Sequence, residues 1–229
     1  MHSVELSPVF YRDNSKSSGF LADVAKKVLH VKNHQFHFGA AVPKFINEIG
    51  GDIDFLILDT VHSLPGEILD FLVVLPLLKP NAIVCMHDVA MNQYDVASPM
   101  SHATNLLFSS VTADKIFNFV PEGLNNTPLR ITHFRYPNIA AFQINQETVR
   151  NIINVVLALN LRWAYLPSNA DLINYTACIH QMYDKNICRI YDEAVNMNLY
   201  NMIMMTNTYD KTLKENVYNM MKNIYRIQS

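Results

Sequence analysis

The stretch IDFLILD, residues 53–59, decides the fold class of this chain of 229 residues. Its four successive apolar residues, 55–58, predict a strand that is buried on both faces, as in a parallel sheet. A helix is predicted at residues 65–78, and a second apolar strand at residues 82–86 runs into His87-Asp88. Strands separated by helices of this length are typical of βαβ units. We therefore predict an α/β fold with a Rossmann-like, doubly wound and mostly parallel sheet.

Further predicted elements extend this pattern on both sides. Upstream lie β-like runs at residues 3–6 and 35–38 and helices at residues 17–29 and 43–49. Downstream, β-like runs at residues 129–134 and 139–144 predict a closing β-hairpin. Amphipathic spacing then predicts only helices, at residues 147–161, 169–183, 187–197 and 211–225. We expect two parts, a Rossmann-like domain at residues 1–145 and a C-terminal helical region at residues 146–229.

The composition excludes several classes of protein. A net charge of −2 gives no electrostatic footprint for nucleic acid or for an anionic membrane. Three scattered cysteines are too few for a disulfide framework or a zinc site. The longest apolar stretch, residues 68–78, is interrupted by Asp70 and Pro76 and is too short to span a bilayer. No signal peptide opens the sequence, so we expect a cytoplasmic protein.

Polar or small residues follow four predicted strands, at the edge where an open α/β sheet binds its ligand. These residues are Glu5, Gly39, Ala40, Ala41, Asp59, His62, His87 and Asp88. The two carboxylate oxygens of Glu5 can accept hydrogen bonds from ribose hydroxyls, although a solvated surface glutamate fits equally well. The small residues 39–41 would let an adenine approach the backbone, or they form an ordinary turn.

Asp59, His87 and Asp88 follow neighbouring predicted strands, so their oxygen and nitrogen atoms would converge on Mg²⁺ or another divalent cation. The alternative is that Asp59 caps the next helix and His87 packs against it. His62, in the same loop as Asp59, is a candidate general base for a substrate hydroxyl. Trp163 faces a substrate or, as we favour, anchors a helix junction.

Three segments together resemble one group of class I S-adenosylmethionine (SAM)-dependent methyltransferases. They are the Asp-x-x-His-Ser element at residues 59–63, the turn LLKPNA at residues 77–82, and the His-Asp at residues 87–88. Residues 3–7 resemble the family's second strand, which ends in a ribose-binding acid. The resemblance covers roughly residues 3–145 and extends to metal-dependent O-methyltransferases of small molecules.

The resemblance implies a role for each candidate residue. Glu5 would hold the ribose of SAM, and Gly39, Ala40 and Ala41 would lie near its adenine. His62 would sit by the transferred methyl group and would be catalytic together with Asp59, which would also contact the cofactor. Asp59, His87 and Asp88 would bind the divalent cation, His87 standing where many relatives have an acid.

The sequence departs from the family pattern in two places. Asn81-Ala82 replaces the usual Gly-Gly of the turn. The family's first strand and Gly-x-Gly loop would precede Ser3, where only Met1 and His2 stand, so we expect an N-terminally truncated domain. Three explanations remain open: a fragment, a contracted sheet in which residues 3–6 pair with residues 53–58, or a decayed paralogue without activity.

Methyl transfer from SAM to an oxygen or nitrogen of a small molecule, such as a sugar or sugar-linked metabolite, is the predicted function. The alternative is a non-catalytic binding or scaffold module, in which the C-terminal helices form a homodimer face. A metal-dependent hydrolase is a third hypothesis, but the sequence has no nucleophile elbow and no tight histidine pair to support it.

Overall fold

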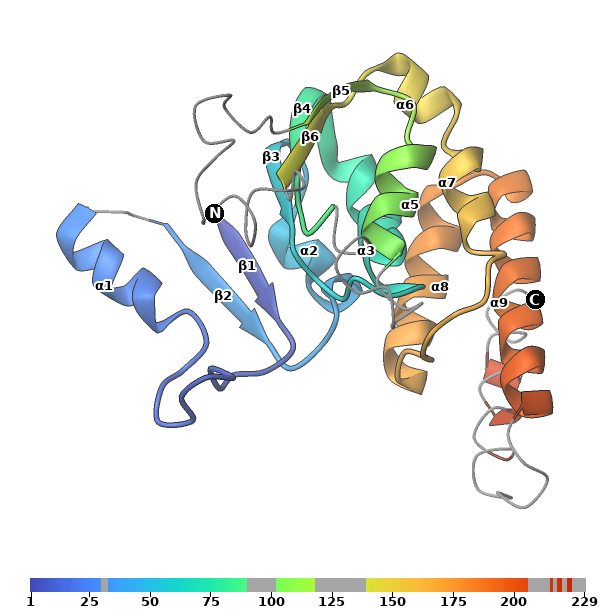
Figure 1. Ribbon diagram of the computed structural model, residues 1–229, viewed down its shortest axis with the longest axis horizontal. Helices are drawn as coiled ribbons and strands as arrows, with labels where there is room; N and C mark the ends of the chain where they lie inside the picture. The colour runs from blue at the N-terminus through green and yellow to red at the C-terminus, as the bar shows by residue number, and fades with distance from the viewer. Residues whose placement is uncertain are drawn as a thin grey trace, which may run out of the picture. The chain divides into compact units, whose positions relative to one another are not determined.

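The computed structural model describes residues 1–29, 33–89, 102–117 and 139–205, together with residues 215, 218–219 and 222–223. The chain divides into two compact units (Figure 1), an N-terminal unit, Met1–Gly50, and a C-terminal unit, Gly51–Ser229. The boundary predicted at residue 145 stays a prediction. Within the described ranges, no helix is long and apolar enough to cross a membrane.

The N-terminal unit is built on one parallel pair of strands. Its elements are β1 (His2–Glu5), α1 (Phe20–Leu29), β2 (Gln35–Phe38), the 3-10 helix η1 (Val42–Phe45) and α2 (Ile46–Ile49). β1 and β2 pair in parallel, with His2 opposite Gln35 and Glu5 opposite Phe38. A parallel pair with α1 between its strands confirms the predicted βαβ unit. The short helical segment ends at Gly50, whose φ of 71° suits glycine.

The C-terminal unit contains a four-stranded sheet in the order β3-β4-β6-β5. Its strands are β3 (Ile53–Leu58), β4 (Leu78–His87), β5 (Asp114–Phe117) and β6 (Ile139–Gln143). β3 and β4 are parallel and are joined through α3 (Gly66–Val74) and the 3-10 helix η2 (Leu75–Leu77), while β6 is antiparallel to both of its neighbours. The α/β class is therefore confirmed, but this sheet is small and mixed rather than mostly parallel.

The described strands test part of the expected strand pairing. The β-like run predicted at residues 129–134 lies outside the described residues and stays a prediction, while β6 pairs with β4 and β5. β1 and β3 belong to different sheets, so the contracted sheet in which they pair directly is not formed. The departure at Asn81 is accommodated, because its φ of 68° lies in the left-handed region that asparagine tolerates better than most residues.

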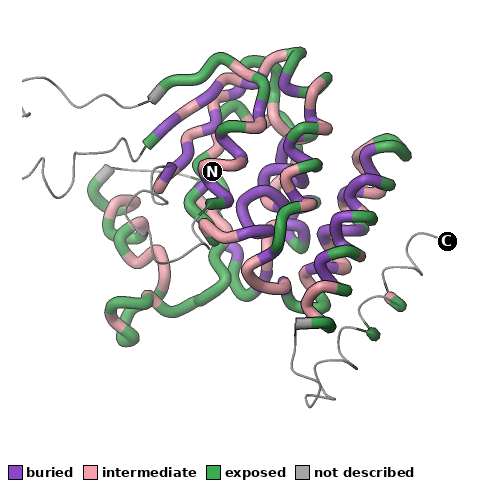
Figure 2. The backbone as a smooth tube through the Cα atoms, turned by 45° about the vertical axis from the view of Figure 1, so that its right-hand side comes forward, coloured by how far each residue is buried: buried purple, intermediate pink, exposed green. Residues whose placement is uncertain are grey.

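The rest of the C-terminal unit is helical. Its helices are α5 (Ala103–Ser110), α6 (Gln146–Arg150), α7 (Ile153–Ala158), α8 (Asn169–Met182) and α9 (Lys185–Met205). α9 packs against α7 and α8, and α8 packs against α3. Buried positions recur along α9 in Figure 2, as its amphipathic spacing predicts. The helix predicted at residues 147–161 is divided in two near Asn151, and most of the predicted helix 211–225 lies outside the described residues.

The two faces of the C-terminal sheet differ in burial. The register places Leu56, Val84 and Phe142 on one face, where the Phe142 ring contacts Phe71 of α3 and Phe108 of α5. On the opposite face, Phe55 is 54% exposed and Ile57 is 63% exposed. The predicted burial of this strand on both faces is therefore wrong. α3 and α5 cover the face that carries Phe142, whereas Phe55 and Ile57 lie on the opposite face.

Asn198 of α9 ties α9 to the segment that follows α7. Its side-chain oxygen accepts a hydrogen bond from the Trp163 backbone N–H at 2.8 Å, and its amide donates to the Leu159 and Ala194 carbonyl oxygens. The Trp163 indole also donates to the Leu159 carbonyl oxygen, and the ring is buried. Trp163 is therefore the anchor of a helix junction, as favoured from the sequence.

Replacing Asn198 with alanine should lower the free energy of unfolding by about 3 kcal/mol, because buried backbone groups lose their partners. Urea denaturation followed by circular dichroism measures this loss. Asn154→Ala, an exposed position on α7, is the matched control and should change stability little. Equal stability of the two variants would contradict the anchoring role of Asn198.

A buried carboxyl group joins α3 to α8. Asp70 accepts a hydrogen bond from the Tyr175 hydroxyl, and Tyr183, directly after α8, donates to the Leu72 carbonyl oxygen at 2.6 Å. Burial raises the pKa of Asp70 to about 6, although its hydrogen bonds to Tyr175 and Thr60 oppose the shift. The folded chain therefore holds the Asp70 proton to a higher pH than the unfolded chain does.

Because the folded-state pKa of Asp70 is raised, its contribution to stability is present at acidic pH and is lost as the pH rises. The free energy of unfolding should fall by about 3 kcal/mol between about pH 4 and pH 6 through this group. Asp70→Asn keeps an acceptor for the Tyr175 hydroxyl and should flatten this dependence. Urea unfolding at a series of pH values tests this, and an unchanged slope in the variant would argue against a protonated Asp70.

Candidate functional site

Four side chains predicted from the sequence meet at the carboxyl end of the β3–β4 pair. The parallel register places Leu58 opposite Met86, so Asp59 and the His87-Asp88 pair leave the sheet at the same edge. Asp88 has a left-handed backbone with a φ of 56°, which aspartate tolerates better than most residues. We call Asp59, His62, His87 and Asp88 the acid–imidazole cluster.

The distances within the acid–imidazole cluster are short enough for a shared cation. His62 Nε2 lies 3.2 Å from Asp88 Oδ2 and 3.6 Å from Asp59 Oδ1. His87 Nδ1 lies 3.3 Å from Asp59 Oδ1 and 3.4 Å from Asp88 Oδ1. Asp59, His62 and Asp88 each offer a ligand atom, and these atoms lie within 4.8 Å of one another. His62 thus joins the two acids as a candidate ligand, and the set Asp59, His87 and Asp88 stays a prediction.

Two buried residues that were not predicted from the sequence contact the Nδ1 side of the His62 ring. Glu67 of α3 and Thr104 of α5 are both fully buried. His62 Nδ1 lies 3.2 Å from Glu67 Oε1 and 3.1 Å from Thr104 Oγ1, and the Thr104 hydroxyl donates to the Glu67 carboxylate. Glu67 could have been found from the sequence, because it is a charged residue among the apolar residues of α3. Thr104 is 42 residues from His62, and no pattern in the sequence links the two.

The surrounding acids stabilise a positive charge at His62. The pKa of His62 is raised from its ordinary value by the hydrogen bond to Glu67 and by the charges of Glu67, Asp88 and Asp59, while burial opposes the shift. The imidazole therefore binds a proton more tightly than a free histidine does. The same negative field would favour a divalent cation at this edge.

The His62 loop depends on a close backbone approach at Gly66. A Cβ atom on Gly66 would lie 2.7 Å from the Val61 carbonyl oxygen and 2.8 Å from the Tyr165 hydroxyl. On its other side the loop is fixed by α5, because the Ala103 backbone N–H donates to the His62 carbonyl oxygen at 3.1 Å. Glycine at position 66 thus helps to set the position of His62.

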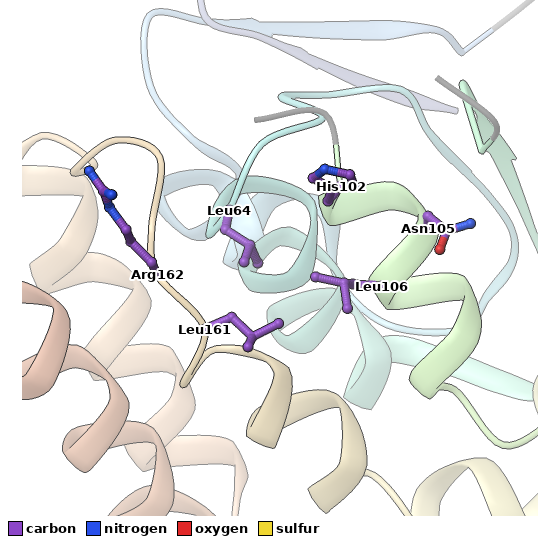
Figure 3. A pocket seen from close by; sticks show the side chains of 6 residues that line it. All are labelled: Leu64, His102, Asn105, Leu106, Leu161 and Arg162. Atoms are coloured by element: carbon purple, nitrogen blue, oxygen red, sulfur yellow. The ribbon is translucent and has the colours of Figure 1, made fainter. Parts of the chain in front are cut away.

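A cavity of about 310 Å³ opens beside this loop (Figure 3). Its lining residues are Leu64, His102, Asn105, Leu106, Leu161 and Arg162. Leu64 follows His62 by two residues, and His102 immediately precedes α5, which carries Thr104. The three leucines provide apolar surface, while His102, Asn105 and Arg162 provide polar groups. The cavity is therefore suited to a small molecule with both apolar and polar parts.

The remaining sequence-predicted residues belong to the N-terminal unit. The Gly39 backbone N–H donates to the Glu5 carbonyl oxygen at 3.0 Å, so the ends of β1 and β2 lie side by side. Glu5 is exposed, Ala40 is buried and Ala41 is half-buried. Gly39 has a φ of 83°, and a Cβ there would meet no atom within 4 Å. A carboxylate and an open backbone turn thus stand together, and their assignment to cofactor binding stays a prediction.

Gly66→Ala should displace the His62 loop, because the new methyl group would overlap the Val61 backbone oxygen. We expect a loss of about 1–3 kcal/mol in the free energy of unfolding, with shifted NMR signals for His62. The control is Gly51→Ala, where a Cβ would meet nothing within 4 Å. Unshifted His62 signals in Gly66→Ala would contradict this role of Gly66.

Comparison with known proteins gives a family match for part of the chain. Residues 1–89, which include β1, β2, β3, β4 and the acid–imidazole cluster, match a family model described as a methyltransferase domain. No curated protein and no solved structure matches the chain. The family implies SAM as the methyl donor, in agreement with the resemblance found from the sequence. Residues 1–89 of this chain are therefore similar to the methyltransferase domains that this family model describes.

Proposed function

We propose that this chain transfers a methyl group from SAM to an oxygen or nitrogen atom of a small molecule, such as a sugar or sugar-linked metabolite. The observation that carries the proposal is the convergence of Asp59, His62 and Asp88 at a strand edge within the residues that match the methyltransferase family. A methyl acceptor must lose a proton and be oriented, and a cluster of acids and imidazoles can do both.

The residues of the N-terminal unit fit SAM. Glu5 would accept hydrogen bonds from the two ribose hydroxyls, and the open turn at Gly39 leaves room for a flat ring against the backbone. Ala40 and Ala41 would contact the adenine through small apolar side chains. Bound SAM supplies a methyl group that its sulfonium charge makes electrophilic.

The cavity beside the His62 loop would hold the acceptor. Its volume of about 310 Å³ is at the lower end of the range for small-molecule sites. Leu64 and Leu106 would contact an apolar part of the acceptor, and Arg162 would bind a negatively charged or hydroxyl-rich part. This combination favours a small polar metabolite over a macromolecule.

His62 has two possible uses in activating the acceptor. As a base, its Nε2 would take the proton of the acceptor hydroxyl or amine. As a ligand, the same Nε2 would join Asp59 and Asp88 around a divalent cation, which lowers the pKa of a bound hydroxyl. Both uses need the same Nε2 lone pair, so His62 cannot serve as base and as ligand at once. If His62 is a ligand, activity should be lost when a chelator removes the cation and should return when the cation is added back.

A non-catalytic binding protein is the second candidate function. The observation that favours it is the exposed apolar pair Phe55 and Ile57 on one face of the C-terminal sheet, since large exposed apolar surface often marks a binding site. A homodimer through the C-terminal helices is a related proposal, supported by the exposed side chains of Tyr200 and Met204 on α9.

Asp88→Asn separates the two functions. Asparagine tolerates the left-handed backbone but removes the charge, so methyl transfer to an acceptor found by screening should fall about 100-fold or more while the fold is kept. Asp114→Asn, an exposed carboxylate at the start of β5, is the control and should keep full activity. Equal activity of the two variants would contradict the proposed site.

Calorimetric titration of SAM into the folded chain should give micromolar binding, with and without Mg²⁺. A folded chain that binds no SAM would instead favour the non-catalytic function.

A further inference from the structure

The hydrogen bonds behind His62 decide which of its ring nitrogens carries the proton. Nδ1 has two near neighbours, Glu67 Oε1 at 3.2 Å and Thr104 Oγ1 at 3.1 Å. The Thr104 hydroxyl has one hydrogen, and it donates this hydrogen to the Glu67 carboxylate. Both neighbours therefore present only lone pairs to Nδ1. A hydrogen on Nδ1 would satisfy both of these neighbours.

The opposite nitrogen of the neutral ring then has a lone pair, and it lies among acids. His62 Nε2 is 3.2 Å from Asp88 Oδ2 and 3.6 Å from Asp59 Oδ1. Three electron-rich atoms at these distances repel one another unless a positive charge lies among them. The charge can be a second proton on the imidazole or a divalent cation.

We propose that Glu67 and Thr104 are positioning residues that hold His62 in the Nδ1–H tautomer and aim its Nε2 lone pair at Asp59 and Asp88 as the third ligand of a divalent cation. This proposal rests on the proposed function, because the cation would activate the methyl acceptor. Glu67 and Thr104 are both fully buried and would act on the site through the His62 ring.

Burial makes this arrangement stiff. Glu67 and Thr104 are fully buried on α3 and α5, two helices that pack against each other. An outer carboxylate that accepts from one nitrogen of a metal-binding histidine fixes the orientation of the ring and raises its basicity as a ligand. The carboxylate of Glu67 is placed to do this for His62.

An imidazole ligand from His62 also affects which cation is bound. An imidazole nitrogen with two carboxylates suits Mn²⁺, Co²⁺ or Zn²⁺, whereas Mg²⁺ prefers oxygen ligands alone. We therefore expect the chain to bind Mn²⁺ more tightly than Mg²⁺. The sequence left the cation open between Mg²⁺ and another divalent ion, and an imidazole ligand from His62 favours Mn²⁺.

The first test reads the tautomer directly in the unaltered chain. Long-range ¹H–¹⁵N NMR spectra of the histidine-labelled protein, without SAM and at an alkaline pH where the imidazole is neutral, should show His62 as the Nδ1–H tautomer. Glu67→Gln should raise the share of the Nε2–H tautomer, because a glutamine amide can donate to Nδ1. A wild-type His62 in the Nε2–H form overturns the proposal.

The second test measures cation affinity by calorimetric titration of Mn²⁺ into the chain. Thr104→Val keeps the side-chain shape but removes the hydroxyl, and it should raise the Kd about 10- to 100-fold. Thr104→Ser should restore most of the affinity. Thr176→Val is the matched control, since Thr176 is also fully buried and hydrogen-bonded but belongs to α8.

Equal Mn²⁺ affinities for Thr104→Val and Thr176→Val would overturn the proposal, as would tighter binding of Mg²⁺ than of Mn²⁺. Neither test involves SAM or an acceptor. A chain that shows the tautomer and the Mn²⁺ affinity but transfers no methyl group would therefore contradict the proposed function alone.

Discussion

The parallel pairing of β3 with β4 is the constraint on which the rest of the C-terminal unit depends. Parallel strands run out at the same edge of a sheet, so the register that places Leu58 opposite Met86 also brings Asp59 and Asp88 together. Two carboxylates held this close repel each other in the absence of positive charge. The strand pairing thus favours a cation or a proton near the two carboxylates. The imidazoles of His62 and His87 lie within 3.6 Å of both of them.

α3 connects this edge to the helical region through two buried acids. Glu67 and Asp70 are three residues apart and therefore lie on adjacent turns of one helix. Glu67 contacts His62 and Thr104 at the candidate site, while Asp70 accepts a hydrogen bond from Tyr175 of α8. A buried carboxyl group is stable only with hydrogen-bond partners, so each acid requires a particular neighbour. The helical region is in this way coupled to the element that supports the site.

The open face of the C-terminal sheet stands in contrast to this tightly bonded edge. Val84 and Phe142 are buried where α3 and α5 pack, while Phe55 and Ile57 on the other face are exposed. In β3, apolar side chains thus alternate between a covered and an uncovered face. An apolar run in a sequence indicates that each of its residues prefers burial. It does not indicate which faces of the strand are covered by helices.

The sequence by itself determined the order of the elements, because strand, helix and turn preferences act over a few residues. It placed β2 at its observed bounds and identified the parallel unit around residues 53–59, and the strand-end rule selected Asp59, His62, His87 and Asp88 without coordinates. Only the tertiary structure decided the partners of those residues. The contacts of His62 with Thr104 and of Asp70 with Tyr175 join positions 42 and 105 residues apart, and no local pattern encodes such distances. The antiparallel pairing of β5 with β6, the burial of Glu67 and the exposure of Phe55 likewise follow from how elements pack, which is a property of the whole unit.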